Sequence, residues 1–303
     1  MRYRVKPGKP FTQEIRSLAQ HQLRTAEKAL TEQPDGLHEA IHEARKKFKR
    51  VRGLYRLIAK GQKEFRAREN ARLRDTAASL SVVRDATALV ETLDYLAGFT
   101  ETPEEAQSIE HARDILKARR EEVADAATDL KDDVQAAIGS CQSAIEALSE
   151  LNFDDHPKKV AKLLGKSWVK TLERAHSNLA ECQDNVHAEA FHELRKTAQT
   201  YWMYNSLLRD IWPSAMNAKR SQTKALVDLL GHEHDITLLV ELLNLDASML
   251  GVGEELSHLL GVIIRQQQIL RREALTLAAS VFQDTPEREA NTISTLWMAA
   301  SDT

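Results

Sequence analysis

The sequence predicts an all-α protein made of two antiparallel four-helix bundles related by a pseudo-twofold internal repeat, and three observations support this fold class. The 303 residues include only 11 glycines and 7 prolines, and good helix formers such as Ala, Leu, Glu and Lys dominate. Apolar residues recur at alternating spacings of three and four, the period of an amphipathic helix. Two motifs also recur at an offset of 150 residues: HEARK at 42–46 returns as HELRK at 192–196, and 83–91 resembles 233–241. We therefore predict two helical repeats, 1–150 and 151–303.

Helices in the first half are placed from their start and stop signals. Thr12 is expected to cap the first helix, and Thr102 followed by Pro103 is a strong start for the fourth. The pattern after Pro103 is too long for one straight helix. The predicted helical segments are 12–31, 37–60, 62–97 and 103–150.

The second half repeats this plan after a boundary at 152–157. The tail, 284–303, is weakly patterned and is expected to be marginal or to dock as a short helix. Four helices in each half are the number that closes an antiparallel bundle. The predicted helices lie near 158–183, 187–211, 214–245 and 253–282.

Composition limits the possible functions. The formal net charge is −3, so binding of an anion requires cations segregated onto one surface. Cys141 and Cys182 have no motif spacing and are expected to be free, buried thiols in a reducing compartment. No apolar run has the length of a membrane span, and the N-terminus lacks the apolar segment of a signal peptide. We therefore expect a soluble, cytoplasmic protein.

The helix predicted after residue 37 carries two adjacent stripes. Leu37, Ile41 and Ala44 begin an apolar stripe that continues through Phe48 and Tyr55. One residue further on, a basic stripe follows the same spacing over roughly 27 Å of helix. Its members are His38, His42, Arg45, Lys49, Arg52 and Arg56, with Lys46 and Arg50 on its outer edge. The stripe is either an anion-binding surface or a solvated face neutralised by acidic neighbours.

The second copy favours binding, because the halves diverge nearly everywhere else and yet keep His192, Arg195 and Lys196. The positions that follow in its stripe carry no charge: Gln199, Trp202 and Ser206. The first half is therefore expected to contribute more positive charge. The neighbouring Arg and Lys are also expected to lower the pKa of His42 and His192.

These motifs resemble the CHAD family, the conserved histidine α-helical domain. The first-half pattern His-x-x-Arg-Lys-x-x-Lys-Arg-x-Arg over 42–52, its partial repeat at 192–196, Arg84-Asp85 and the segment 230–236 carry the resemblance, which extends over about 3–280. It implies two four-helix bundles around a basic groove, binding of inorganic polyphosphate, association with polyphosphate granules, and no known catalysis. We expect no metal or cofactor. Gln199 and Trp202 depart from the family pattern.

The resemblance also implies a set of ligand residues. Polyphosphate is a linear polyanion whose affinity comes from many charge-assisted contacts, and a row of Arg and Lys along a helix suits it. The histidines could either contact ligand or be buried and hydrogen-bonded. The polyphosphate-binding candidates are His42, Arg45, Lys46, Lys49, Arg50, Arg52, His192, Arg195 and Lys196, with Arg56 added from the stripe.

Four other functions remain open. Glu39 and His42, like Glu189 and His192, have the Glu-x-x-His spacing of di-metal helical bundles, although cations follow directly. A metal-dependent phosphohydrolase could instead use His192 with the sequence pair His234-Asp235. A basic stripe also suits a nucleic acid, although few aromatics for base stacking lie near it, or an acidic protein partner.

Overall fold

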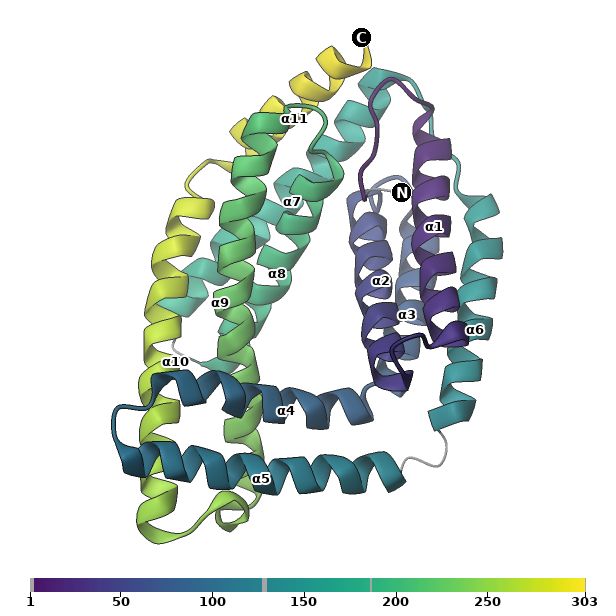
Figure 1. The fold of residues 1–303 in the computed structure, drawn as a ribbon. Coiled ribbons are helices and arrows are strands. Elements are labelled where there is room, and N and C mark those ends of the chain that lie inside the picture. The colour runs from purple at the N-terminus through teal and green to yellow at the C-terminus, as the bar shows by residue number, and fades with distance from the viewer. Residues whose placement is uncertain (1–2, 127–129, 186, 303) are drawn as a thin grey trace.

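The structure, a computed structural model, describes residues 3–126, 130–185 and 187–302 and is all-α over these residues, which confirms the all-α prediction (Figure 1). The helices are α1 (Phe11–Glu32), α2 (Leu37–Leu57), α3 (Lys63–Ser79), α4 (Val82–Leu96), α5 (Pro103–Ala126), α6 (Leu130–Ala147), α7 (Pro157–Asp184), α8 (Ala188–Leu207), α9 (Pro213–Leu245), α10 (Gly253–Val281) and α11 (Pro286–Ser301).

Four helices of the first half, α1, α2, α3 and α6, pack side by side (Figure 1). Each turns an apolar face inward, with Leu23, Phe48, Leu73 and Val134 among the buried side chains. The same hydrophobic core continues through Leu164 and its neighbours on the second-half helices. The two halves therefore share this core.

The segment predicted as one helix over 62–97 is two helices, because the chain turns at Leu80 and Ser81. The segment 103–150 is also divided, into α5 and α6. The physical reason is a second hydrophobic core, in which Leu93 of α4 and Ile109 of α5 pack with Leu239 of α9 and Val262 of α10. Figure 1 shows the α4–α5 pair crossing from the first bundle to α9 and α10. By sequence the α4–α5 pair is part of the first half, but its apolar side chains pack in the second core with α9 and α10.

The second half follows its predicted boundaries within a few residues. α7, α8, α9 and α10 pack in succession. The tail forms α11, which packs along α7 and buries Trp297 to 2 % exposure. The expectation of a docked short helix is thus confirmed.

The two predicted helix caps have different outcomes. At the start of α5, Glu105 N donates to Thr102 Oγ1 at 3.2 Å, and the Glu105 carboxylate accepts from Glu101 N at 2.7 Å, so this start is confirmed. The prediction for Thr12 is wrong, since α1 begins at Phe11. Thr12 instead donates from N and from Oγ1 to Asp155 Oδ1, at 2.7 and 2.8 Å. A carboxylate 143 residues away, which no local pattern reveals, satisfies this helix start.

The two helices that carry the basic motifs cross each other. α2 contacts α8 where Gly53 lies against Met203, and a side chain at Gly53 would overlap the methionine sulfur. The N-terminal segment joins the pair, because Tyr3 donates to the Arg50 carbonyl at 2.7 Å and Val5 N donates to the Leu207 carbonyl at 2.8 Å. This crossing fixes how the basic faces of the two halves meet.

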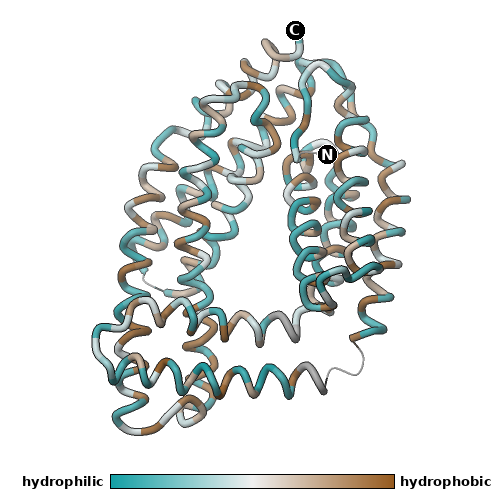
Figure 2. Tube along the Cα trace, in the orientation of Figure 1, coloured by the Kyte–Doolittle hydropathy of each residue, from teal (hydrophilic) through white to brown (hydrophobic). Residues whose placement is uncertain are grey.

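Hydrophilic and hydrophobic residues are mixed along the helices in Figure 2. Of the helices that the structure describes, none combines the length and apolar character needed to cross a membrane.

Candidate functional site

Most of the apolar stripe predicted on α2 is buried. Ile41, Ala44, Phe48, Val51 and Tyr55 are at most 2 % exposed. The basic side chains one position further on therefore lie at the edge of the bundle, partly or fully accessible to solvent.

Several members of the basic stripe already have partners within the first bundle. Lys46 forms an ion pair with Glu43 at 2.5 Å, and Arg45 donates to the Ala77 carbonyl. Arg52 Nε donates to Asn70 Oδ1 at 3.1 Å. Part of the charge in the stripe is thus used in holding α2 to its surroundings.

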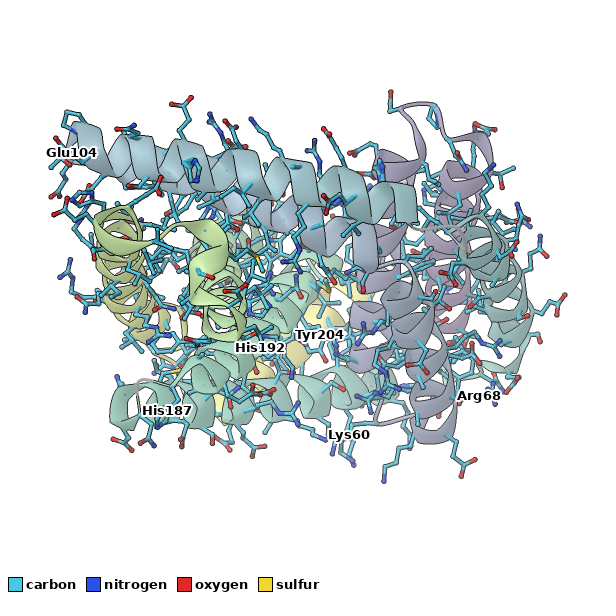
Figure 3. The ribbon with its side chains drawn as sticks, turned by 90° about the horizontal axis from the view of Figure 1, so that it is seen from below. Lys60, Arg68, Glu104, His187, His192 and Tyr204 are labelled. Carbon is cyan, nitrogen blue, oxygen red and sulfur yellow. The ribbon has the colours of Figure 1, made fainter. Side chains whose placement is uncertain are left out.

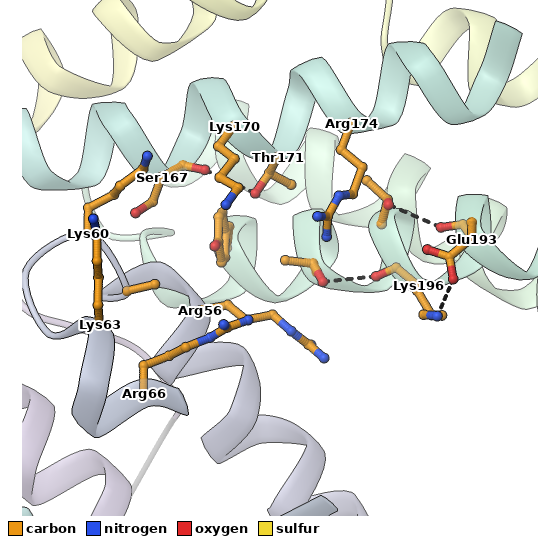
Figure 4. Close-up of a pocket in the computed structure, with 14 residues that line it drawn as sticks. Arg56, Lys60, Lys63, Arg66, Ser167, Lys170, Thr171, Arg174, Glu193 and Lys196 are labelled. Atoms are coloured by element: carbon orange, nitrogen blue, oxygen red, sulfur yellow. Dashed lines mark hydrogen bonds and ion pairs between the residues drawn. The ribbon is translucent and has the colours of Figure 1, made fainter. Parts of the chain in front are cut away.

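A cavity of about 420 Å³, hereafter the basic pocket, opens between α2–α3 and α7–α8 (Figure 4). The figure shows Lys170 and Arg174 extending from α7 toward the wall formed by Arg56 and Arg66. Seven cationic side chains and one carboxylate, Glu193, line it. The cations are Arg56, Lys60, Lys63, Arg66, Lys170, Arg174 and Lys196.

These cations lie close together, and few negative charges neutralise them. Burial, with the nearby Arg66 and Arg174 guanidinium groups, lowers the pKa of Arg56. Over the described ranges, none of these cations other than Lys196 forms an ion pair with a carboxylate, and the buried Arg66 Nε lacks a hydrogen-bond acceptor. Like charges gathered in a partly desolvated cavity attract anions strongly.

Two further hollows receive other members of the stripe. One, of about 300 Å³, is lined by Arg45, Lys49, Arg52 and Arg74 together with Asp85. Burial there, with the charges of Arg56 and Arg74, lowers the pKa of Arg52 to about 10.

The second of these hollows, of about 760 Å³, is lined by Arg50 together with Arg4, Arg209 and Arg220. In it Arg4 is paired with Asp210 at 2.9 Å. His42, Lys46, His192 and Arg195 line none of the three cavities.

His192 of α8 lies against His234 of α9, with ring centroids 4.6 Å apart (Figure 3 labels His192). Burial lowers the pKa of His192, and Lys196 lowers it further, so the predicted direction is confirmed while its main cause is desolvation. Burial and the charges of Arg195, His192 and Lys49 lower the pKa of His234 to about 4. Charge from α2 and α8 therefore converges on this histidine pair.

Both histidines are expected to destabilise the fold in acid. A histidine that is neutral when folded takes up a proton on unfolding below its ordinary pKa of about 6.5. The stabilisation from His234 is complete above that pH and is lost progressively down to about pH 4, by less than about 3 kcal/mol because partial exposure to solvent screens these charges. Urea unfolding at pH 7.5 and pH 5 should show that His234→Gln loses less stability between the two than the wild type. Equal losses in both proteins would contradict the assignment.

The donor groups for a metal are limited. Among the residues with described side chains, one group of three can bring its donor atoms within 4.8 Å of one another, namely Glu39, His42 and Glu43. Lys46 and Lys47 both pair with Glu43, at 2.5 and 3.2 Å, and their charge opposes a divalent ion. The second Glu-x-x-His unit lies on another helix, α8, outside this group.

The sequence patterns singled out two residues of the basic pocket, Arg56 and Lys196, and missed the other five cations. Lys60, Lys63 and Arg66 follow the end of the α2 stripe, and Lys170 and Arg174 lie four residues apart on α7. The four-residue spacing of Lys170 and Arg174 could have been read from the sequence as one basic helix face. No pattern in the sequence, however, shows that this face of α7 lies opposite α2. The side chain of Arg84, in the first-half motif, lies outside the described residues.

The sequence and the fold were compared with known protein families and solved structures. A family model described as the CHAD domain matches residues 15–244. The fold is similar to the crystal structure of the CHAD domain from the plant Ricinus communis, with a TM-score of 0.59, 16 % sequence identity and 93 % of each chain covered. No curated protein matches the sequence.

Proposed function

The chain belongs to the CHAD family, and on that premise we propose that it binds inorganic polyphosphate in the basic pocket without hydrolysing it. The observation that carries the proposal is the pocket lining of seven cations and one carboxylate, contributed by both halves of the chain. A linear polyanion gains affinity from many such contacts and from the release of its counterions.

The walls of the pocket suit phosphate better than nucleic acid. Arginine offers bidentate contacts to phosphate oxygens and lysine offers a mobile point charge. Sequence-tolerant binding of single-stranded nucleic acid needs exposed aromatic rings on which bases stack. The aromatic residue in the pocket lining, Tyr204, is only 2 % exposed. The pocket therefore favours a ligand made of phosphate alone.

The same lining supports binding without catalysis. Glu193, its one carboxylate, is engaged by Lys196. Hydrolysis of a phosphoanhydride needs an activated water, which a metal ion or a free general base provides. By binding long polyphosphate without cleaving it, the protein would associate with polyphosphate granules in the cytoplasm.

Titration calorimetry with long-chain polyphosphate at several salt concentrations tests the proposal. Each phosphate neutralised on a single-stranded polyanion should contribute about −0.7 to the slope of log affinity against log salt. An affinity that does not change between low and physiological salt would contradict multivalent charge binding. Competition with single-stranded RNA at fixed salt separates the two ligands. Phosphate release in the presence of Mg²⁺ or Mn²⁺ would reject the non-catalytic function.

A further inference from the structure

A row of lysines runs along the exposed face of α7 and ends in the basic pocket. Its members are Lys159, Lys162, Lys166, Lys170 and Arg174, at successive spacings of three, four, four and four. All five are exposed. Since side chains three or four residues apart are neighbours on a helix, they form one continuous line of positive charge about 22 Å long.

The helix gains no stability from this row. Like charges at these spacings repel each other and weaken a helix. In the described part of the chain none of the five forms an ion pair, and the one acidic residue among 157–174 is Glu173. The positive charge of the row is not neutralised by neighbouring carboxylates and does not stabilise the helix. It is therefore free to bind an anion from solution.

The other side of α7 is committed to packing. Leu164, Trp168 and Leu172 are fully buried, and Ser294 of α11 donates to the Ala161 carbonyl at 3.2 Å. The lysine row therefore lies on the opposite, solvent-facing side of α7 from the core and α11.

The row and the pocket share two side chains, since Lys170 and Arg174 also line the basic pocket. Figure 4 shows both extending from α7 into it. A linear anion bound in the pocket can thus extend along Lys166, Lys162 and Lys159 and remain in contact with cations over its whole length.

We propose that this α7 lysine row is a second segment of the ligand site and holds the part of a long polyphosphate chain that extends out of the basic pocket. The inference rests on the proposed function and adds a length preference to it. A short chain fills the pocket alone, whereas a long chain contacts the pocket and the row together.

The test compares tripolyphosphate with long-chain polyphosphate at one fixed ionic strength. The variant is Lys159→Gln/Lys162→Gln/Lys166→Gln, which leaves every pocket residue in place. The control, Lys28→Gln/Lys131→Gln/Lys224→Gln, removes the same charge from exposed positions on α1, α6 and α9.

The α7 variant should bind the long chain about tenfold more weakly than the control does and bind tripolyphosphate within about twofold of it, because each exposed charge contact is modest and three act together. If the α7 variant and the control bind the long chain equally, the row is no part of the site. An equal loss for both ligands would also reject the length preference. If the wild type binds neither ligand, the proposed function itself fails.

Discussion

Replacing Arg56 and Arg174 together by glutamine should lower the affinity for long-chain polyphosphate about 100-fold at low ionic strength. The two guanidinium groups come from opposite walls of the basic pocket, α2 and α7, and neither has a carboxylate partner in the described structure. A hydrogen bond to a charged group contributes about 1.5–3 kcal/mol, and solvent screening reduces the sum for two such contacts. Calorimetric titration measures the loss.

A matched control is Arg24→Gln/Arg272→Gln, which removes the same charge from two exposed arginines on α1 and α10. The control should change affinity only slightly. In the pocket variant the slope of log affinity against log salt should also become shallower by about 1.4, because two phosphate contacts are lost. Similar losses in the two proteins would mean that net charge, and not the pocket, governs binding.

Glu289→Ala is expected to destabilise the protein by about 3–5 kcal/mol. Glu289, 3 % exposed, joins α11 to three other helices: it accepts hydrogen bonds from Trp168 Nε1 at 2.9 Å and Tyr201 OH at 2.5 Å, and it pairs with Lys219 at 3.1 Å. Removing it leaves a buried indole N–H and a buried hydroxyl without their acceptor and breaks the ion pair of the buried carboxylate with the partly exposed Lys219. Urea unfolding measures the change in free energy.

Glu287→Ala is the control on the same helix, because its side chain is exposed, and it should change stability by less than about 0.5 kcal/mol. Glu289→Gln keeps an acceptor oxygen and should recover part of the loss. A Glu289→Ala protein as stable as the Glu287→Ala protein would show that α11 docks through apolar contacts such as Trp297 alone.

Patterns within single helices were readable from the sequence because they depend on the helical period alone. The α2 stripe shows this: its apolar positions lie in the core, and its basic positions lie at the surface one residue on. The lowered pKa of His192 was also readable in direction, since charged neighbours at three and four residues are fixed by the helix. Desolvation by the rest of the fold is nevertheless its larger cause.

Helix ends and breaks were less readable where distant residues set them. Asp155 satisfies the start of α1 that Thr12 was expected to cap. The break at Leu80 and Ser81 lets α4 reach α9 and α10, and nothing in the local sequence reports that second core.

By itself, the sequence determined the all-α class, most helix positions in the second half, and one basic helix face in the first. The tertiary structure alone decided which cations share a cavity. Arg56 and Lys196 lie in one cavity with Lys170 and Arg174 only because α2 crosses α8 beside α7. The earlier members of the basic stripe on α2, such as Arg45 and Arg50, line two other cavities instead. The physical reason is that periodicity fixes directions around one helix axis, whereas a pocket depends on how several axes cross, and the packing of distant side chains such as Gly53 on Met203 sets that crossing.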